Sequence, residues 1–207
     1  MLFVITSSNL CTDDFLSRIE SIASAKPNRI ILREKQLSPD EYMHLALECK
    51  KICEKYSVPF SINSFTDIAE KTGVSDIHIP LSVLEKNPSL VSKFKTVGVS
   101  VHSVDDAKKA EKLGASYVIF GHIFPTDCKK DLAPRGTELL KNVVSSVDIP
   151  VLAIGGITKE RINQILNTGA DGICVMSHFM KCQNAFKEVS DFKILSGITQ
   201  NNSETGS

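Results

Sequence analysis

The sequence has no excess of either charge and no hydrophobic run long enough to cross a membrane. Lysine plus arginine and aspartate plus glutamate each number 24, so the formal net charge is +0. This balance gives no global electrostatic reason to bind nucleic acid or an anionic membrane, and no basic helix occurs that could enter a DNA groove. No apolar stretch approaches the roughly 18 residues that a membrane helix requires. We therefore expect neither nucleic acid nor a membrane as a partner.

The chain also lacks the sequence spacings of common metal sites and of secreted proteins. No His-x-Glu, His-Glu-x-x-His or Cys-x-x-Cys spacing occurs, which argues against a metal site built by the protein alone. The apolar segment 1–6 is too short for a signal peptide and has no basic start. The six cysteines are scattered through an aliphatic-rich chain, so we expect reduced thiols. These features predict a cytoplasmic protein.

Short aliphatic segments alternate with helical patterns along the chain. The predicted strands are Leu2–Thr6, Arg29–Arg33, Pro59–Ile62, Asp76–Ile79, Thr96–Val101, Tyr117–Phe120, Pro150–Ile154 and Gly172–Met176. The predicted helices are Asp13–Ala25, Pro39–Tyr56, Phe65–Thr72, Pro88–Phe94, Val104–Leu113, Thr137–Val147, Thr158–Asn167 and Gln183–Phe192. Repeated strand–helix units with near-continuous aliphatic strands are typical of a parallel sheet covered by helices.

The length of 207 residues suits one α/β barrel. Eight strand–helix units predict a single (β/α)8 TIM barrel over residues 1–196, with a doubly wound sheet as the alternative. No linker or second domain is visible, and the small, polar residues 197–207 predict a disordered C-terminal tail. In a barrel we expect functional residues at the C-terminal ends of the strands, with phosphate held after the seventh and eighth strands. The sequence leaves open whether the protein forms a homo-oligomer.

A glycine and a histidine follow the sixth predicted strand. Gly121 permits a sharp turn, which directs His122 toward the space that the following loop encloses. That loop continues with Thr126 and Lys129, which offer a hydroxyl and a positive charge to an anion. We therefore predict that His122 transfers a proton beside an anion-binding loop.

Two glycines follow the seventh predicted strand, and a serine follows the eighth. Gly155 and Gly156 expose backbone N–H groups directly before a predicted helix, whose N-terminus adds a partial positive charge. Met176 and Ser177 supply another N–H group and a hydroxyl. Because barrels hold phosphate at these two strand ends, the four residues predict a phosphate-binding site.

Polar residues at the ends of the second and third strands give weaker signals. The segment Arg33–Lys35 places two cations and a carboxylate at the functional rim, where a rim ion-pair network, which is common and weak, is the alternative to ligand binding. Asn63 either orients a polar ligand or caps the helix that follows it. His78 and His102, on or beside the next two strands, are predicted to be structural histidines.

Together these residues resemble the thiamine phosphate synthase/TenI superfamily from the first strand to the last helix. The matching stretches are Leu32–Lys35, Ile62–Asn63, Val97–Ser103, Phe124–Thr126, Lys129, Ala153–Gly156 and Gly169–Gly172. The resemblance implies a barrel that binds thiamine precursors, with Ser100 and Thr126 among the residues that contact the substrate.

The resemblance also separates two branches of this superfamily. The synthase joins a pyrimidine diphosphate to a thiazole phosphate, and two aspartates serve the Mg²⁺ that neutralises the departing pyrophosphate. Ser64 and Val83 stand at those positions, so the pyrimidine diphosphate half of the site looks dismantled. The Gly121-His122 turn looks like the TenI branch, the thiazole tautomerases, which aromatise a thiazole carboxylate phosphate without a cofactor. For that branch the resemblance implies His122 as the catalytic acid/base, a role that suits an imidazole with a pKa of ~6.5.

The predicted function is therefore that of an isomerase, a thiazole tautomerase of thiamine biosynthesis, with a small-molecule thiazole phosphate as its ligand and no cofactor. The predicted site comprises His122 as acid/base, Gly155, Gly156, Met176 and Ser177 around the phosphate, and Arg33, Lys35, Asn63, Ser100, Thr126 and Lys129 as other substrate contacts. Two alternatives stay open. One is thiamine phosphate synthase itself, which would use Mg²⁺, and the other is a non-catalytic regulator that binds a thiamine precursor.

Overall fold

The computed structural model describes residues 1–126 and 132–197, so Lys129 and the predicted tail beyond Gly197 lie outside the described residues. Within these ranges the strands are β1 (Leu2–Ile5), β2 (Arg29–Leu32), β3 (Phe60–Asn63), β4 (Asp76–Pro80), β5 (Thr96–Val101), β6 (Tyr117–Gly121), β7 (Val151–Ile154) and β8 (Gly172–Val175). Each predicted strand has an observed counterpart, and no strand end differs from its prediction by more than one residue.

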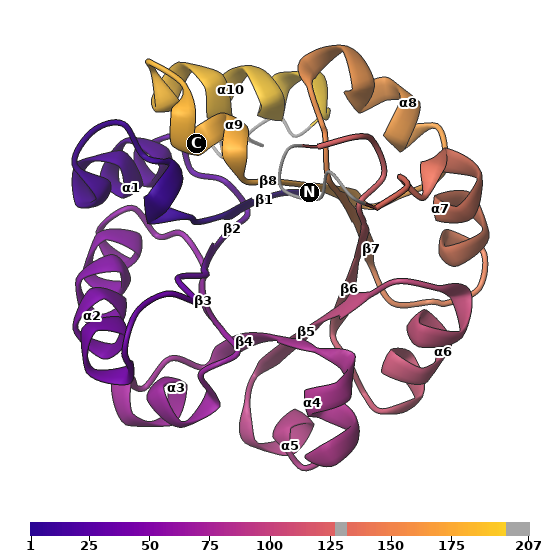
Figure 1. Cartoon of the computed structure of the whole chain (residues 1–207), viewed down its shortest axis with the longest axis horizontal. Helices are drawn as coiled ribbons and strands as arrows, with labels where there is room; N and C mark the ends of the chain where they lie inside the picture. The colour runs from indigo at the N-terminus through magenta and orange to yellow at the C-terminus, as the bar shows by residue number, and fades with distance from the viewer. Residues whose placement is uncertain (127–131, 198–207) are drawn as a thin grey trace, which may run out of the picture.

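The strands close into a ring. Each strand pairs in parallel with the next one in the chain, and β8 returns to pair with β1, placing Ile173 opposite Leu2. Figure 1 shows this ring with the helices around its outside. The predicted (β/α)8 TIM barrel is therefore confirmed. The doubly wound alternative is wrong, because an open sheet would leave its two edge strands unpaired.

The helices of the described residues form the outer layer. They are α1 (Phe15–Ser24), α2 (Pro39–Lys55), α3 (Thr66–Thr72), α4 (Leu81–Lys86), α5 (Leu90–Lys93), α6 (Val104–Lys112), α7 (Gly136–Val144), α8 (Ile162–Leu166), α9 (Ser177–Lys181) and α10 (Ala185–Leu195), with short 3-10 turns η1 (Ser8–Leu10) and η3 (Lys159–Arg161). Side-chain caps begin several of them. The Ser38 hydroxyl accepts a hydrogen bond from the backbone N–H of Glu41, whose carboxylate binds the Ser38 N–H in return.

The sequence missed two short helices and merged one pair of elements. No helix was expected at α4 or α9, and the single helix expected over Thr158–Asn167 is divided into η3 and α8. The two missed helices have five or six residues, and neither begins with a side-chain cap. A helix this short, without a capping side chain, leaves almost no periodic or capping signal in a sequence.

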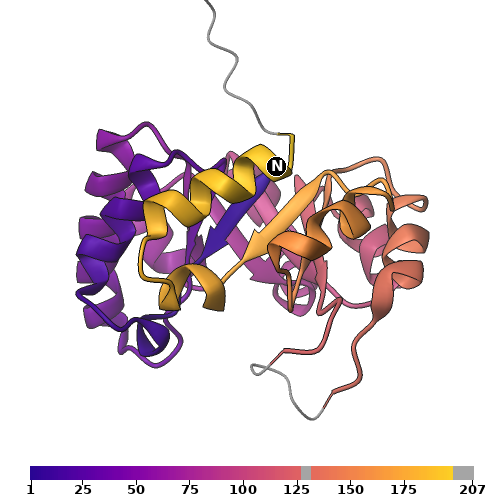
Figure 2. The ribbon, with the colours of Figure 1, turned by 90° about the horizontal axis from the view of Figure 1, so that it is seen from above.

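The apolar residues form two layers. The larger layer lies between the barrel and its helices, and the smaller fills the barrel interior with Phe3, Ile5, Ile31, Tyr117, Ile119, Leu152 and Cys174. In Figure 2 the strands β1 and β8 point toward the edge from which the described residues that follow β6 and precede α7 project. The ring therefore gathers the C-terminal ends of its strands, and the loops that follow them, at one end of the molecule.

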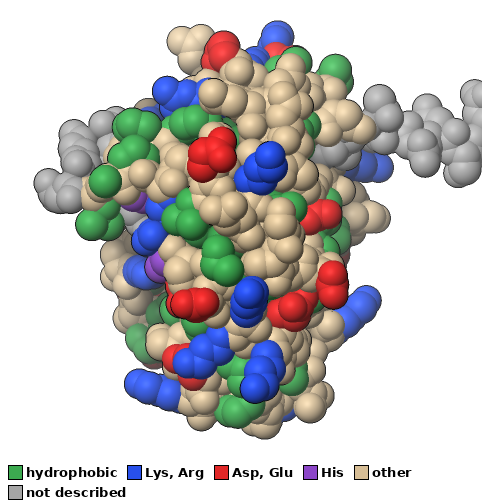
Figure 3. Space-filling model, turned by 90° about the vertical axis from the view of Figure 1, so that its right-hand side faces the viewer, with side chains coloured by type: hydrophobic (Ala, Val, Ile, Leu, Met, Phe, Trp, Pro, Cys, Tyr) green, Lys and Arg blue, Asp and Glu red, His purple; other side chains and the backbone are tan. Residues whose placement is uncertain are grey.

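The face of the molecule that carries α6, α7 and α8 does not separate the charges by sign. Figure 3 shows acidic and basic side chains interspersed over the face that carries α6, α7 and α8. Among the helices of the described residues, none combines the length and the apolar character that crossing a membrane requires.

Candidate functional site

A cavity of about 1950 Å³ lies at the C-terminal ends of the strands. The predicted site residues that line it are Arg33, Lys35, Asn63, Ser100, His122, Thr126, Gly155, Gly156, Met176 and Ser177. They come from six different strand ends or the loops that follow them. Of the predicted site, Lys129 alone falls outside the described residues. The fold thus brings together side chains that are up to 144 positions apart in the sequence, from Arg33 to Ser177.

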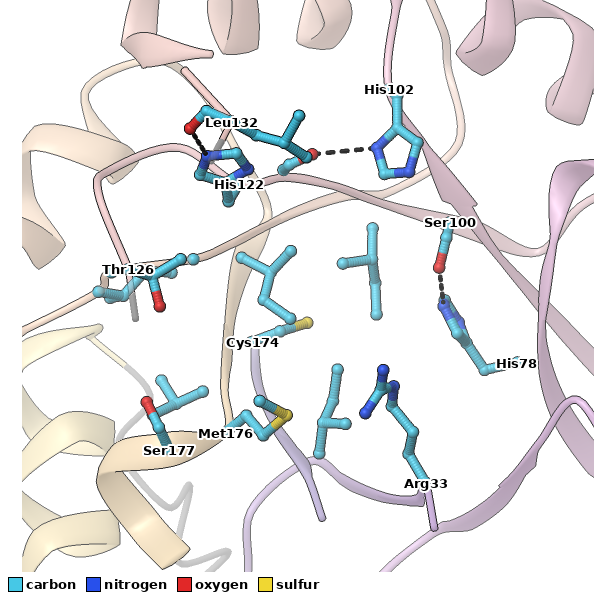
Figure 4. A pocket seen from close by; sticks show the side chains of 18 of the residues that line it. Arg33, His78, Ser100, His102, His122, Thr126, Leu132, Cys174, Met176 and Ser177 are labelled. Carbon is cyan, nitrogen blue, oxygen red and sulfur yellow. Dashed lines mark hydrogen bonds between the residues drawn. The ribbon is translucent and has the colours of Figure 1, made fainter. Parts of the chain in front are cut away.

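Two groups of polar side chains lie on opposite sides of the cavity. Figure 4 shows Thr126 and Ser177 on one side, whereas Arg33, Ser100 and His78 lie on the other. Apolar and sulfur-containing side chains, including those of Cys174 and Met176, form the floor between them. The arrangement can hold a ligand with two polar ends, or two ligands whose less polar parts meet in the middle.

The glycine loop after β7 is shaped by its neighbours as well as by its own backbone. Gly155 and Gly156 have φ values of +105° and +64°, which disfavour any residue with a side chain. A Cβ atom on Gly155 would lie 2.3 Å from the Cβ of His122, and one on Gly156 would lie 2.5 Å from the carbonyl oxygen of Pro125. The paired glycines therefore allow the loops after β6 and β7 to pack closely, and this purpose was not expected from the sequence.

The carboxylate between Arg33 and Lys35 does not take part in an ion pair with them. Glu34 is 1% exposed, and its oxygens accept hydrogen bonds from the Thr6 hydroxyl at 2.5 Å, from Ser8 and from Gln36. These neutral donors join the loops after β1 and β2. The ion-pair interpretation of this segment is therefore wrong, and both cations line the cavity.

Asn63 fixes the strand beside it. Its amide nitrogen donates to the carbonyl oxygen of His78 at 3.1 Å, and its amide oxygen accepts from the Ser64 hydroxyl at 3.1 Å. The residue before α3 is Phe65, and this helix has no side-chain cap. The capping alternative for Asn63 is therefore wrong, and its buried amide forms part of the cavity wall.

His78 has the structural environment that the sequence predicted, and it also reaches the cavity. Its ring nitrogens lie 2.8 Å from the Ser100 hydroxyl and 3.3 Å from the Tyr117 hydroxyl. Burial, with a smaller contribution from the charge of Arg29, lowers the pKa of His78 from 6.5 to about 3. The ring is therefore neutral at physiological pH and orients the Ser100 hydroxyl.

His122 is held by the loop that follows it. Its Nε2 atom lies 3.1 Å from the carbonyl oxygen of Leu132, and because a carbonyl only accepts, Nε2 carries the proton. Its Nδ1 atom is buried without a hydrogen-bond partner among the described residues. The side chain is 4% exposed. The imidazole thus joins β6 to its loop, and the residue lines the cavity.

Arg161 also lines the cavity, although the sequence did not indicate it as a site residue. It lies in η3, where its Nη1 atom donates to the carbonyl oxygen of Gly156 at 2.7 Å. Its guanidinium carbon lies 4.7 Å from the centre of the Phe124 ring. Because the sequence pattern placed Arg161 inside a longer helix, nothing marked it as a site residue except its position just after the two glycines.

The residues present do not match the carboxylate pair that the resemblance implies for Mg²⁺. Ser64 and Val83 occupy those two positions. Among the described residues, the carboxylates that line the cavity are those of Glu85, Asp105 and Asp106. No group of three or more histidine, cysteine, aspartate or glutamate side chains within residues 1–126 and 132–197 could hold a metal ion.

Two of these three carboxylates already have partners. Glu85 forms an ion pair with Lys109, and Asp106 accepts a hydrogen bond from the backbone N–H of His102 at 2.8 Å. Hard cations such as Mg²⁺ prefer oxygen ligands with a negative charge, and the serine at position 64 supplies none. The donor set does not fit this metal site.

Comparison with known proteins finds one matching family and several relatives named for the same activity. A family model described as thiamine monophosphate synthase matches residues 2–179. The thiamine-phosphate synthase of Clostridium acetobutylicum is 38% identical over 185 residues, which cover 88% of each chain. That of Methanobrevibacter smithii is 35% identical over 185 residues, again covering 88% of each chain. The solved thiamine phosphate pyrophosphorylase of Pyrococcus furiosus is 28% identical with a TM-score of 0.81, and the match covers 95% of both chains.

These findings correct the functional prediction. The relatives are named for the synthase and not for the TenI tautomerase branch, so the prediction of a thiazole tautomerase is wrong. That prediction gave the most weight to His122 and to the missing carboxylates at Ser64 and Val83. The similarity that runs along most of the chain outweighs these three positions.

Proposed function

The chain belongs to the thiamine monophosphate synthase family, and from this membership we propose that it joins a pyrimidine diphosphate to a thiazole phosphate to form thiamine phosphate. The observation that carries the proposal is the cavity with two polar ends in a chain of this family. Two anionic substrates whose reacting atoms meet between their charged groups need separate anion sites and a shared, less polar middle. The two groups of polar side chains and the less polar floor between them support this arrangement.

The reaction places different demands on the two ends. A thiazole ring nitrogen forms a bond to the pyrimidine methylene carbon, while the bond from that carbon to the diphosphate oxygen breaks. The electron pair of the broken bond leaves on pyrophosphate. Negative charge thus grows on the leaving group, and cations placed beside it stabilise the transition state.

We assign the leaving group to the end of the cavity that contains Arg33 and Lys35. Both side chains line the cavity, and Arg33 is positioned through its backbone N–H, which donates to the Thr6 hydroxyl at 2.9 Å. Because the residues present do not fit a carboxylate-held Mg²⁺, these two cations would neutralise the charge of the departing pyrophosphate. Ser100, oriented by His78, and Asn63 line the same end and would contact the pyrimidine.

We assign the thiazole phosphate to the opposite end. Gly155, Gly156 and Met176 would offer backbone N–H groups, and Ser177 and Thr126 would offer hydroxyls. The condensation transfers no proton between the rings, so the acid/base role predicted for His122 has no step to serve. Its contact with Leu132 supports a positioning role for the loop after β6 instead.

The proposal is tested by incubating the purified protein with both substrates and Mg²⁺ and separating the products by chromatography. We expect thiamine phosphate from the wild-type protein. Arg33→Gln is expected to lower kcat/KM roughly 10- to 100-fold, since a hydrogen bond to a charged group is worth about 1.5–3 kcal/mol. Lys112→Gln removes an equal charge from the exposed end of α6 and should leave kcat/KM unchanged. Absence of product from wild-type protein at saturating substrate would refute the proposal.

A non-catalytic binder of thiazole phosphate is the second candidate, and the absent carboxylates at positions 64 and 83 favour it. Such a protein would retain one end of the cavity and bind the pyrimidine diphosphate weakly. Titration of each substrate separately distinguishes the two functions. Tight thiazole phosphate binding without turnover would favour the binder, whereas binding of both substrates with turnover supports the synthase.

A further inference from the structure

The guanidinium of Arg161 is fixed beside the glycine loop by contacts from two different loops. Nη1 donates to the carbonyl oxygen of Gly156 at 2.7 Å, and the group lies 4.7 Å from the centre of the Phe124 ring. The first contact comes from the loop after β7 and the second from the loop after β6. A planar cation held by a hydrogen bond and a cation–π contact loses little freedom when it binds a further group.

No ion pair joins Arg161 to a carboxylate within residues 1–126 and 132–197, although the adjacent Glu160 interacts with its charge electrostatically. The neighbouring Lys159 differs, because its Nζ atom lies 3.0 Å from Glu188 and 2.7 Å from Asp191. Glu188 also lies 2.6 Å from Nε2 of His178. Around the ends of β7 and β8, Arg161 is thus a fixed cation whose protein contacts are a neutral carbonyl and a ring.

A phosphate at the glycine loop needs more than neutral donors. Backbone N–H groups and the Ser177 hydroxyl can hydrogen-bond to its oxygens, but they carry no net charge. A guanidinium presents five N–H groups in a planar fork that matches two phosphate oxygens. With one N–H committed to Gly156, Arg161 retains donors for such an anion.

We propose that Arg161 binds the phosphate of the thiazole substrate and makes this end of the cavity selective for the phosphorylated thiazole over its alcohol. The inference rests on the proposed function, because it takes the thiazole phosphate as the occupant of this end. Arg161 lines the cavity together with Gly155, Gly156 and Ser177. Its contacts with Phe124 and Gly156 also tie the two loops together, so phosphate binding and loop position are coupled.

Calorimetric titration of the thiazole phosphate and of the thiazole alcohol tests this assignment without requiring turnover. Arg161→Gln is expected to raise the Kd of the phosphate roughly 10- to 100-fold, the effect of losing a charge-assisted hydrogen bond. The Kd of the alcohol should change less than about twofold, and Lys112→Gln should change neither. Equal weakening of both ligands, or no weakening of the phosphate, would overturn the proposal.

Arg161→Lys keeps the positive charge and removes the planar guanidinium, so it tests the two contributions separately. We expect it to restore part of the phosphate affinity that Arg161→Gln loses, with thermal unfolding confirming that each variant is folded. If Arg161→Gln does not fold, the test compares the Kd values of Arg161→Lys with those of the wild-type protein. A phosphate Kd at least threefold higher with an unchanged alcohol Kd supports the role of the fork, and identical affinities contradict it.

These outcomes are independent of the synthase assay. A wild-type protein that binds thiazole phosphate through Arg161 but forms no thiamine phosphate would refute the synthase proposal and leave the Arg161 assignment standing. If the wild-type protein forms thiamine phosphate but Arg161→Gln retains full affinity for thiazole phosphate, the synthase proposal stands and the Arg161 assignment is refuted.

Discussion

At the scale of single residues, His78 makes the stability of the fold depend on pH. The folded protein keeps the pKa of His78 near 3 through burial and the charge of Arg29, whereas the unfolded chain has the ordinary value of 6.5. The unfolded state therefore takes up a proton as the pH falls through about 6.5, and the folded state does so only near 3. The stability contribution is complete above pH 6.5 and declines as the pH falls toward 3, by up to about 1.4 kcal/mol per pH unit.

We predict that His78→Gln removes this dependence of the free energy of unfolding on pH. The free energy of unfolding, measured by urea titration between pH 5 and 6.5, should depend less on pH in the variant than in wild type. His44→Gln, which changes an exposed histidine on α2, serves as the control and should retain the wild-type slope. Equal slopes in wild type and His78→Gln would show that His78 titrates normally in the folded protein.

Ser64 also carries a prediction, because its backbone is in the left-handed region with φ at +67°. Aspartate and asparagine adopt this conformation more readily than most residues. Ser64→Asp should therefore change the free energy of unfolding by less than about 1 kcal/mol, a typical surface effect. It also places a carboxylate beside Asn63 on the cavity wall.

The new carboxylate should raise the affinity for a divalent cation. We expect the Kd of Mn²⁺, measured by calorimetry, to fall at least threefold in Ser64→Asp, because a charged oxygen is a preferred ligand of hard cations. Ser64→Asn has the same backbone preference without the charge and should leave the Kd unchanged. An equal gain in both variants, or no gain in either, would contradict this interpretation of the donor set.

At the scale of elements, the loop after β7 depends on glycine for two separate reasons. Gly156→Ala would combine an unfavourable φ of +64° with a Cβ placed 2.5 Å from the Pro125 carbonyl oxygen. We predict a loss of about 2–4 kcal/mol in the free energy of unfolding, together with weaker phosphate binding.

Gly136→Ala is the matched control for this change. Its φ of +75° is similar, but no described atom lies within 4 Å of the added Cβ. We expect it to cost only about 1–2 kcal/mol, the strain of a left-handed residue alone. Urea unfolding of both variants measures the difference, and equal losses would mean that contact between the two loops contributes nothing.

The sequence predicted the long elements well and the short ones poorly. Strand segments such as Tyr117–Phe120 are continuous hydrophobic runs, so the local sequence alone predicts them. The helices α4 and α9 emerge directly from strand ends without side-chain caps, and their formation depends on packing that a local pattern does not contain. The same reason explains why Arg161, in η3, was not recognised.

At the scale of the whole molecule, the barrel itself made the site partly predictable. A closed ring brings every strand end to one edge, and residues as distant as Arg33 and Ser177 line the same cavity. The contacts within that cavity could not be predicted. The burial of Glu34 among neutral donors and the pairing of His78 with Ser100 depend on side-chain directions that emerge only from the packed fold.

The choice between the branches of the superfamily failed for a different reason. It depended on a few positions, namely 64, 83 and 122, whereas the similarity to the relatives extends over most of the chain. His122 has a well-defined structural contact with Leu132, so its presence at the strand end does not require catalysis. A motif at a strand end indicates a pocket residue, and only the remainder of the chain indicates which reaction the pocket supports.

The most direct test of the proposed synthase function measures thiamine phosphate and pyrophosphate in the same reaction. The account predicts that both products accumulate in equal amounts when the pyrimidine diphosphate and the thiazole phosphate are supplied together, and that neither forms when one substrate is omitted. Pyrophosphate release without thiamine phosphate, or the absence of both products at saturating substrate, would contradict it.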